Sequence, residues 1–306
     1  MTKLKKEIPT KIVFLGEINS INLEIICNSF EKLKNKVNYY IIGSRSKIEK
    51  YLKKINNNIK INYINDPLDF NLNKNFLNIY DLTYNKSNFD ELNNQIILCN
   101  QICNLTGFDL VTMPIDKSVF KKRIKFIGMT EYLGHLNKID TFMLMKGENF
   151  SIIPLTTHIS IDQLRKEITL KKINKFFKKF IPLNKKIKKN YNLHKSKFIC
   201  INPHCGEEGS LNKQDLNIKN LLKNLPIKID GPYPADSVFI GDTKNCLFFS
   251  TYHDQALIPF KLLNKFSCNI TLGLNYRRLS PAHGPAKDIL FKNKSDNRSY
   301  IECMTN

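Results

Sequence analysis

The 306-residue sequence lacks any long apolar run. No stretch approaches the ~18 consecutive apolar residues that indicate a transmembrane helix. The short apolar run 12–15 near the start has neither the length nor the flanks of a secretory signal. An apolar share of 42% and a charged share of 25% are ordinary for a folded protein, which excludes disordered and fibrous chains. We therefore expect a cytoplasmic globular protein of about two domains.

Paired cysteine motifs are also missing. The eight cysteines include no Cys-x-x-Cys pair, so the sequence gives no sign of a zinc knuckle. Cys99 and Cys103 are one helical turn apart, which is more typical of a shared helix face than of a metal site. Without a secretory signal, we expect all eight to be reduced thiols, most of them packed as small hydrophobic side chains.

Acidic residues are scarce relative to basic ones. There are 27 Asp and Glu against 48 Lys and Arg, which gives a net charge of +21. The positive electrostatic potential of such a chain is compatible with an anionic substrate and could also suit a nucleic acid. The lysines are spread along the chain, however, and no basic stripe is interleaved with exposed aromatics. We attribute most of the charge to a drift in composition towards Lys, Asn and Ile, and expect neither a nucleic-acid nor a membrane partner.

Short β-branched or aromatic runs alternate with longer amphipathic stretches, which predicts an α/β fold with a largely parallel sheet. Strands are expected at 11–15, 37–42, 110–113, 141–145, 151–155, 198–202, 246–251 and 269–272. The clearest helix begins at Ser160, in a capping box with Gln163, and its apolar face reaches Phe180. The Asn-rich segment 57–75 and the segment 182–197 are expected to be loops.

Three of the six histidines, His158, His204 and His253, each follow directly after an expected buried strand. Ligands of open α/β sheets bind beyond the carboxyl ends of the strands. Three imidazoles at one such edge can hold a divalent metal and leave positions open for a substrate. For each histidine taken alone, a hydrogen-bonded loop residue is the alternative.

Glycine and proline number only twelve each, yet several are gathered in two loops, 202–210 and 230–237. This concentration suggests a fixed backbone beside a ligand, although plain turns are the alternative. Further along, Lys261, Asn269 and Arg278 suit a phosphate or a carboxylate. The alternative of surface solvation is favoured for Arg277, but less for Lys261 and Arg278.

Four motifs then occur in order: Asn-Pro-His-x-Gly-Glu at 202–207, Gly-Pro-x-Pro-Ala-Asp at 231–236, Tyr-His-Asp-Gln-x-Leu-x-Pro-x-Lys at 252–261, and Asn-x-Thr-Leu-Gly-Leu at 269–274. With these motifs, the chain resembles the 4-hydroxythreonine-4-phosphate dehydrogenases of vitamin B6 biosynthesis over nearly its whole length. The segment from Pro114 to Lys117 is similar to the Pro-x-x-Lys segment of that family.

The resemblance implies a fold like that of the isopropylmalate and isocitrate dehydrogenases, with two α/β/α domains and a cleft. These proteins do not use the Gly-x-Gly-x-x-Gly fingerprint, and the sequence contains none. We expect a discontinuous first domain, 1–121 plus 255–306, and a second domain, 122–254, that carries the interface of a homodimer.

The resemblance also implies which residues form the site. The three histidines correspond to the ligands of one divalent metal (Zn, Mg or Co), one of them coming from the partner subunit. The residues that match the family's substrate-binding positions are Thr130, Lys261, Asn269 and Arg278. Asp236 and Asp254 lie in matching motifs, so either is the general base or orients a ligand histidine. Lys117 is a further candidate for proton transfer or cofactor contact.

The implied reaction is the oxidation of 4-phosphooxy-L-threonine by NAD or NADP. It gives a β-keto acid that decarboxylates to 3-amino-2-oxopropyl phosphate. A metal lowers the pKa of the substrate alcohol, a base removes the proton, and a hydride passes to the cofactor.

The sequence departs from the family at three ligand-facing motifs, one of which is Ala282-His283-Gly284-Pro285-Ala286 in place of the family's Asp-His-Gly-Thr-Ala. The loop Gly16–Leu23 has lost a proline and two glycines, and Met129 stands where the family has a substrate-binding histidine, with His135 as a weak replacement. Two alternatives therefore stay open: a dehydrogenase for another phosphorylated hydroxy acid, and a catalytically weakened relative that acts as a binding protein. Retention of the three histidines with Lys261, Asn269 and Arg278 argues against the second.

Overall fold

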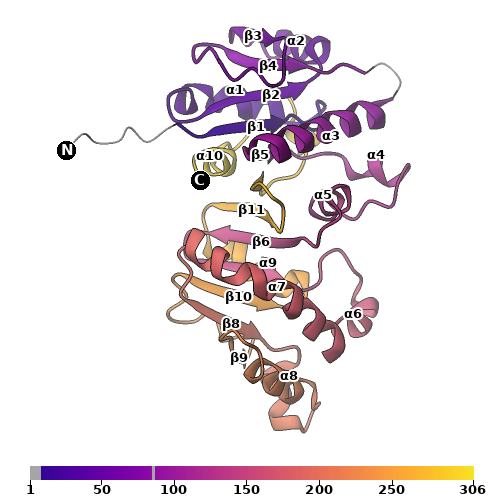
Figure 1. Ribbon diagram of the computed structural model, residues 1–306, viewed down its shortest axis with the longest axis vertical. Coiled ribbons are helices and arrows are strands. Elements are labelled where there is room, and N and C mark those ends of the chain that lie inside the picture. The colour runs from indigo at the N-terminus through magenta and orange to yellow at the C-terminus, as the bar shows by residue number, and fades with distance from the viewer. Residues whose placement is uncertain (1–7, 85–86) are drawn as a thin grey trace, which may run out of the picture. The chain divides into compact units, whose positions relative to one another are not determined.

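The computed structural model describes residues 8–84 and 87–306, which fall into two compact units (Figure 1). Unit 1 comprises residues 1–139 and 268–306, and unit 2 comprises residues 140–267. Both units combine parallel strands with covering helices, which confirms the α/β class. No helix in the described part of the chain is long and apolar enough to cross a membrane.

Unit 1 contains strands in the order β3-β4-β2-β1-β5-β12-β11, of which only the β11–β12 pair is antiparallel. The strands are β1 (Thr10–Phe14), β2 (Asn38–Gly43), β3 (Ile61–Ile64), β4 (Leu77–Asp81), β5 (Asp109–Thr112), β11 (Ser267–Leu272) and β12 (Arg278–Pro281). The α-helices are α1 (Asn22–Leu33), α2 (Arg45–Lys54), α3 (Asn88–Thr106), α4 (Lys117–Lys121), α5 (Met129–Asn137) and α10 (Arg298–Thr305). A short 3₁₀ turn spans Lys287–Ile289.

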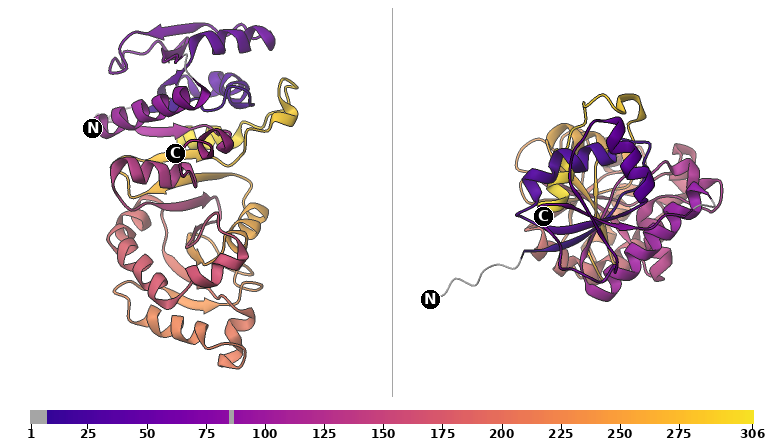
Figure 2. Two further views of the ribbon diagram at one scale, coloured as in Figure 1. Left: turned by 90° about the vertical axis from the view of Figure 1, so that its right-hand side faces the viewer. Right: turned by 90° about the horizontal axis from the view of Figure 1, so that it is seen from above.

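Helices cover both faces of the unit 1 sheet (Figure 2). Alternate residues of the central strands, such as Ile12 and Phe14, pack with α3 in one buried cluster that also holds Cys99 and Cys103. The residues between them point to the opposite face, where α1 and α10 lie in contact. Burial on both faces explains why these strands are almost continuously apolar.

Unit 2 has the strand order β6-β7-β10-β8-β9, with only the β6–β7 pair antiparallel. The strands are β6 (Phe142–Gly147), β7 (Phe150–Pro154), β8 (Lys195–Ile199), β9 (Asp230–Tyr233) and β10 (Cys246–Ser250). The helices are α6 (Ile161–Glu167), α7 (Leu170–Asn190), α8 (Gln214–Lys223) and α9 (His253–Leu263), and a helical turn covers Pro203–Gly209. Aromatic pairs fill the core: Phe249 meets Phe177 at a centroid distance of 5.3 Å and Phe180 at 5.2 Å.

All eight expected strands are confirmed to within a few residues, but four others were missed: β3, β4, β9 and β12. The loop expected at 57–75 was wrong in part, because Ile61–Ile64 pairs with β4 although none of its residues is fully buried. β9 contains Gly231-Pro232, which has the composition of a turn.

The helix expected from Ser160 to Phe180 is two helices, and the loop expected at 182–197 was wrong. The capping box of Ser160 and Gln163 is present, but α6 ends at Glu167 and α7 begins at Leu170. α7 then continues through Pro182 to Asn190. Phe180 and Ile187 on either side of this proline are buried, so tertiary packing outweighs the lost backbone hydrogen bond.

The unit boundaries lie later in the chain than 121 and 254, the positions expected from the sequence. Leu133 of α5 belongs to the core cluster of unit 1, so the chain leaves that unit only after α5. Phe260 of α9 is buried with its ring centroid 5.7 Å from that of Phe150, so α9 belongs to unit 2.

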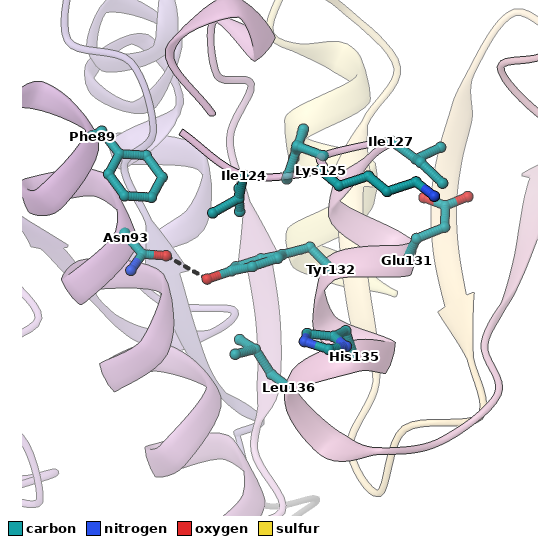
Figure 3. A pocket seen from close by; sticks show the side chains of 10 residues that line it. Phe89, Asn93, Ile124, Lys125, Ile127, Glu131, Tyr132, His135 and Leu136 are labelled. Carbon is teal, nitrogen blue, oxygen red and sulfur yellow. Dashed lines mark hydrogen bonds between the residues drawn. The ribbon is translucent and has the colours of Figure 1, made fainter. Parts of the chain in front are cut away.

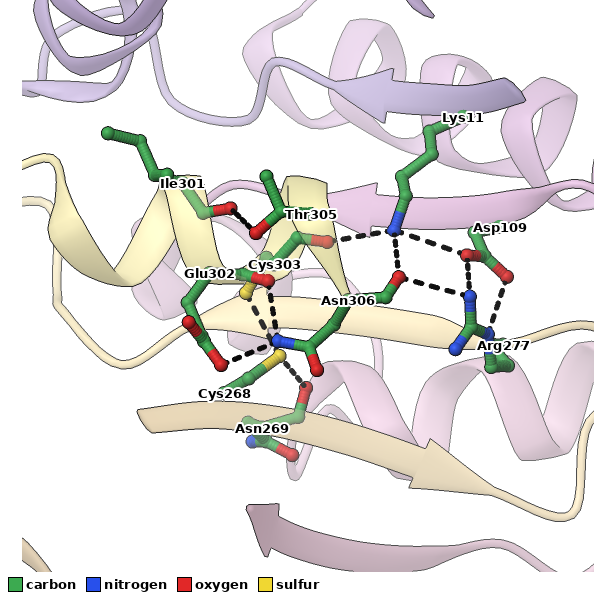
Figure 4. Close-up of polar contacts among 10 residues, drawn as sticks. All are labelled: Lys11, Asp109, Cys268, Asn269, Arg277, Ile301, Glu302, Cys303, Thr305 and Asn306. Carbon is green, nitrogen blue, oxygen red and sulfur yellow. Dashed lines mark hydrogen bonds and ion pairs between the residues drawn. The ribbon is translucent and has the colours of Figure 1, made fainter. Parts of the chain in front are cut away.

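A buried ion pair joins the strands of unit 1 to α10 (Figure 4). The ammonium group of Lys11 is fully buried, 3.2 Å from a carboxylate oxygen of Asp109, and it donates to the carbonyl oxygens of Cys303 and Asn306. Arg277, whose side chain is 42% exposed, pairs with Asp109 through two further hydrogen bonds, so this surface residue is also part of the ion-pair cluster. Burial lowers the pKa of Lys11, and the Asp109 carboxylate opposes that shift.

We predict that Asp109→Ala lowers the free energy of unfolding by about 3–5 kcal/mol, because it leaves the buried Lys11 ammonium without a counter-charge. Lys11→Met should cost clearly less, since Arg277 still pairs with Asp109 and the methionine fills the same space. Urea unfolding followed by circular dichroism measures both values. Equal losses in the two variants would contradict this account.

Candidate active site

The three histidines follow adjacent parallel strands of unit 2. β7, β10 and β8 are neighbours in that order, so their carboxyl ends lie at one edge of the sheet. His158 follows β7, His253 begins α9 directly after β10, and His204 lies in the turn after β8. The expectation that strand topology brings them to one edge is thus met by the order of the strands.

Two of these imidazoles lie together. The ring centroids of His158 and His253 are 5.7 Å apart, with 40° between the ring planes. With metal–nitrogen distances near 2.0–2.1 Å, two imidazoles on one tetrahedral ion have centroids roughly 5 Å apart. The pair therefore fits a divalent cation such as zinc.

Asp254 orients one member of the pair. Its Oδ1 atom lies 2.7 Å from Nδ1 of His253, which leaves Nε2 of that ring available for another partner. A carboxylate on the far nitrogen of a metal-ligating histidine is a common arrangement that fixes the ring and raises its basicity. Of the two roles open to Asp254, the geometry supports orientation of a histidine.

His204 is not part of the histidine pair. In the described residues, 8–84 and 87–306, no three His, Cys, Asp or Glu side chains are grouped so as to hold a metal. A single chain thus brings together two of the three expected ligands. His204 is exposed on the turn 203–209, separate from any such group.

The turn that carries His204 has an unusual backbone. Five consecutive residues, 204–208, are in the left-handed region, with φ between 47° and 76°. Each non-glycine residue in this conformation costs roughly 1–2 kcal/mol, so the surrounding contacts must hold the turn in place. At Gly206 a Cβ atom would lie 2.5 Å from the carbonyl oxygen of Asn212, so only glycine fits there.

Acidic side chains lie close to this turn. Burial raises the pKa of the Cys205 thiol to about 12, and the charges of Asp215 and Asp236 add to the same shift. Asp236 is exposed after β9, in the second of the two Gly/Pro-rich loops. The Sγ atom of Cys205 donates to the carbonyl oxygen of Pro232, which ties the two loops together.

Unit 1 contains a buried cation. Arg278 is 4% exposed, and among the described residues its guanidinium has hydrogen bonds only to the hydroxyls of Thr112 and Thr271. Burial lowers its pKa to about 10, so it remains charged at neutral pH. Two hydroxyls leave guanidinium donors unused, which suits a bound anion.

Thr130 and Asn269 join the surroundings of Arg278. Thr130 lies 3.1 Å from the hydroxyl of Thr271, which is opposite Arg278 in the β11–β12 ladder. Asn269 is two residues before Thr271 on the same strand, and its Oδ1 atom is buried without a hydrogen-bond partner. An acceptor without a partner can take a hydrogen bond from a ligand. The sequence analysis gave no role to Thr112, or to Thr271, although Thr271 is part of the Asn-x-Thr-Leu-Gly-Leu motif.

The remaining candidates are lysines. Lys117 begins α4 in unit 1, and burial lowers its pKa while the Glu131 carboxylate opposes the shift. Lys261 is exposed in the last turn of α9 in unit 2. The expected substrate-binding residues are thus divided between the units, with Thr130, Asn269 and Arg278 in unit 1 and Lys261 in unit 2.

The altered loop after β1 is accommodated without strain at its new residues. Neither Ser20 nor Asn22 has a positive φ, whereas Gly16 keeps φ +70°. A Cβ atom at Gly16 would lie 2.5 Å from the carbonyl oxygen of Pro114. The side-chain amide of Asn22 donates to that same oxygen, at 2.8 Å, and so links the loops after β1 and β5.

His135 does not take the place of the missing histidine at position 129. It lines a pocket of about 530 Å³ with Phe89, Tyr132 and Leu136 (Figure 3). Thr130, by contrast, is buried against Thr271 from the start of the same helix, α5. Met129 packs against the unit 1 core.

Comparison with known proteins gives the same family that the sequence motifs resemble. The family model of the pyridoxal phosphate biosynthetic protein PdxA matches residues 35–306. A 4-hydroxythreonine-4-phosphate dehydrogenase of Sulfurihydrogenibium sp. (strain YO3AOP1) is 30% identical over 314 residues, 95% of either chain. The Aquifex aeolicus protein of the same name is 35% identical over 212 residues, which cover 64% of this chain and 62% of that one.

Solved structures agree in fold. The crystal structure of a 4-hydroxythreonine-4-phosphate dehydrogenase from Klebsiella pneumoniae aligns over 97% of both chains, with a TM-score of 0.82 and 22% identity.

We predict that Gly206→Ala lowers the free energy of unfolding by more than about 2 kcal/mol, because it combines a positive φ with a steric clash. Gly241→Ala is the matched control: φ there is +103°, but no atom lies within 4 Å of the added Cβ. It should cost only about 1 kcal/mol. Urea unfolding of both variants checks this, and a Gly206→Ala protein as stable as the control would refute the steric argument.

Proposed function

Because the chain belongs to the PdxA family of pyridoxal phosphate biosynthetic proteins, whose members are dehydrogenases, we propose that it oxidises 4-phosphooxy-L-threonine with NAD or NADP. The product is a β-keto acid that decarboxylates to 3-amino-2-oxopropyl phosphate. The observation that carries the proposal is the His158–His253 pair at the carboxyl edge of unit 2, whose spacing suits a shared divalent metal.

A divalent metal (Zn, Mg or Co) is held by His158 and His253, with His204 of the partner subunit as the third ligand. Support comes from the spacing of the pair. When bound, the metal supplies a Lewis acid that lowers the pKa of the substrate alcohol. Asp254 keeps the His253 ring oriented for this role.

The anionic end of the substrate is bound by Arg278 in unit 1. Its buried charge, the hydroxyl of Thr130 and the unpartnered Oδ1 of Asn269 together offer a cation, a hydroxyl and an acceptor to a phosphorylated amino acid. Lys261, at the exposed end of α9, adds a second cation.

Proton transfer is assigned to Asp236 and Lys117. Asp254 is engaged by His253, which leaves Asp236 as the carboxylate available for a general base. The lowered pKa of Lys117 brings its amine closer to neutrality, as proton transfer requires. A nicotinamide cofactor would supply the hydride acceptor, and Lys117, at the end of the loop after β5, would contact it.

We further propose a cytoplasmic homodimer that shares its active site between subunits. All eight cysteines are free thiols and seven are buried, as expected in a reducing compartment. The Sγ atoms of Cys268 and Cys303 lie only 2.9 Å apart without being bonded.

A second candidate function is a dehydrogenase for a different phosphorylated hydroxy acid. The observation that favours this alternative is at Met129, which stands in place of a charged hydrogen-bond donor and packs against the core. A panel of phosphorylated hydroxy acids separates the two, since the higher kcat/KM identifies the substrate.

We predict chelator-sensitive reduction of NAD⁺ or NADP⁺ by purified protein with 4-phosphooxy-L-threonine and added Zn²⁺, Mg²⁺ or Co²⁺. His253→Ala should abolish turnover and leave the circular dichroism spectrum unchanged, because the ring is half-exposed and not part of a core. His194→Ala is the control, since that histidine lies outside the site and should keep full activity. Full turnover by His253→Ala in metal-free buffer would refute the proposal.

We predict that Arg278→Gln lowers kcat/KM by about 100-fold or more, because charge-assisted hydrogen bonds contribute roughly 1.5–3 kcal/mol each. Arg298→Gln removes an exposed arginine that pairs with Asp296 and should leave kcat/KM unchanged. Steady-state kinetics measures both. An unaltered kcat/KM in folded Arg278→Gln would show that the anion is bound elsewhere.

A further inference from the structure

The carboxylate of Asp215 connects the start of the His204 turn to the helix that follows it. Asp215 lies in the first turn of α8 and is 1% exposed. Its Oδ1 atom accepts from the backbone N–H of Ile201 at 2.8 Å. Its Oδ2 atom accepts from the backbone N–H of Asn202 at 3.0 Å and from the Asn202 side-chain amide at 2.8 Å. Three charge-assisted hydrogen bonds therefore fix the two residues from which the turn departs.

The far end of the turn is fixed by hydrogen bonds of the turn itself, just before α8 begins. Leu211 N–H donates to the carbonyl oxygen of Gly206, and Ser210 N–H donates to that of Glu207, so the chain leads directly from the left-handed segment into α8. Asp215 thus closes a loop that begins at Ile201 and contains the whole left-handed segment. A left-handed segment is unfavourable for L-amino acids, so it depends on the contacts that hold its two ends.

His204 is the residue that this clamp places. Its own φ is 48°, and it stands two residues after Asn202, whose carbonyl oxygen accepts from the N–H of Cys205. Because the imidazole is exposed, packing of the side chain does not determine where it lies. The position of the ring follows from the backbone of the turn, and that backbone is anchored by Asp215.

We propose that Asp215 is a positioning residue for the metal site, holding the left-handed turn so that His204 is presented as the third ligand. The inference rests on the proposed function, because it takes His204 to be a metal ligand. An aspartate is required, since both oxygens accept from N–H groups. An asparagine must turn its NH₂ group towards one of these donors and so loses a bond and creates a repulsion.

The test uses the full-length protein and its variants Asp215→Asn, His204→Ala and the double variant. Zn²⁺ affinity is measured by equilibrium dialysis, and the absorption spectrum of bound Co²⁺ reports the ligands. Loss of an outer partner of a ligand typically costs 10–100-fold in metal affinity, and we expect a loss of this size in Asp215→Asn. The double variant should bind no more weakly than His204→Ala, because Asp215 acts through His204.

Asp242→Asn is the matched control. It removes one negative charge from the same unit, but Asp242 is exposed and pairs only with the exposed Lys195 and the N–H of Lys244. Its Zn²⁺ affinity should equal that of the unaltered protein. Hydrogen exchange of the amides of 201–206 provides a readout without metal, and it should accelerate in Asp215→Asn and not in Asp242→Asn.

The outcomes distinguish the role of His204 as a metal ligand from the role of Asp215 as a positioning residue. If His204→Ala binds Zn²⁺ as tightly as the unaltered protein, the proposed ligand set is wrong, and hydrogen exchange alone decides whether Asp215 holds the turn. If His204→Ala weakens binding but Asp215→Asn does not, the positioning role is overturned and the metal site stands. Additive losses in the double variant likewise overturn it. If Asp215→Asn fails to fold, Asn202→Ala replaces it, because this variant removes one of the three hydrogen bonds to Asp215. We then expect a smaller loss of Zn²⁺ affinity. This loss should not occur when Asn202→Ala is combined with His204→Ala.

Discussion

The parallel pairing of β7, β10 and β8 is the constraint on which the candidate site depends. Parallel neighbours end at the same edge, so residues that follow them are gathered there whatever their separation in sequence. His158 and His253 meet for this reason, although 94 residues separate them. The side chains around them then set the details: Asp254 orients one ring, and the left-handed turn 204–208 determines where His204 stands.

Two buried cations of unit 1 show how the same charge serves stability or binding. Lys11 has a carboxylate, Asp109, at 3.2 Å and two carbonyl oxygens, so its charge has a directly bonded counter-charge within the fold, which it shares with Arg277. Arg278 is equally buried, but among the described residues its guanidinium donates only to threonine hydroxyls, and the Glu131 carboxylate acts on it through its charge. A buried charge without a directly bonded counter-charge costs free energy unless a ligand supplies one. This difference marks Arg278, rather than the neighbouring Arg277, as the anion-binding residue.

Much of the fold could be predicted from the sequence, because buried stretches such as 12–14 of β1 and 246–249 of β10 are continuously apolar. β3 and β9 were missed since their residues are only partly buried or include Gly and Pro, and pairing with a neighbour alone makes them strands. In the site, the closeness of His158 and His253 could be foreseen from their position after neighbouring strands. The hydrogen bonds of Asp215 and Thr271 could not, because only the folded chain creates these contacts.

The most direct test is a crystal structure of the zinc-loaded protein, with the metal located by its anomalous scattering. The account predicts one zinc ion per site, with nitrogen atoms of His158 and His253 from one subunit and of His204 from the partner at about 2.1 Å. Zinc bound elsewhere, or bound without either member of the His158–His253 pair, would contradict it.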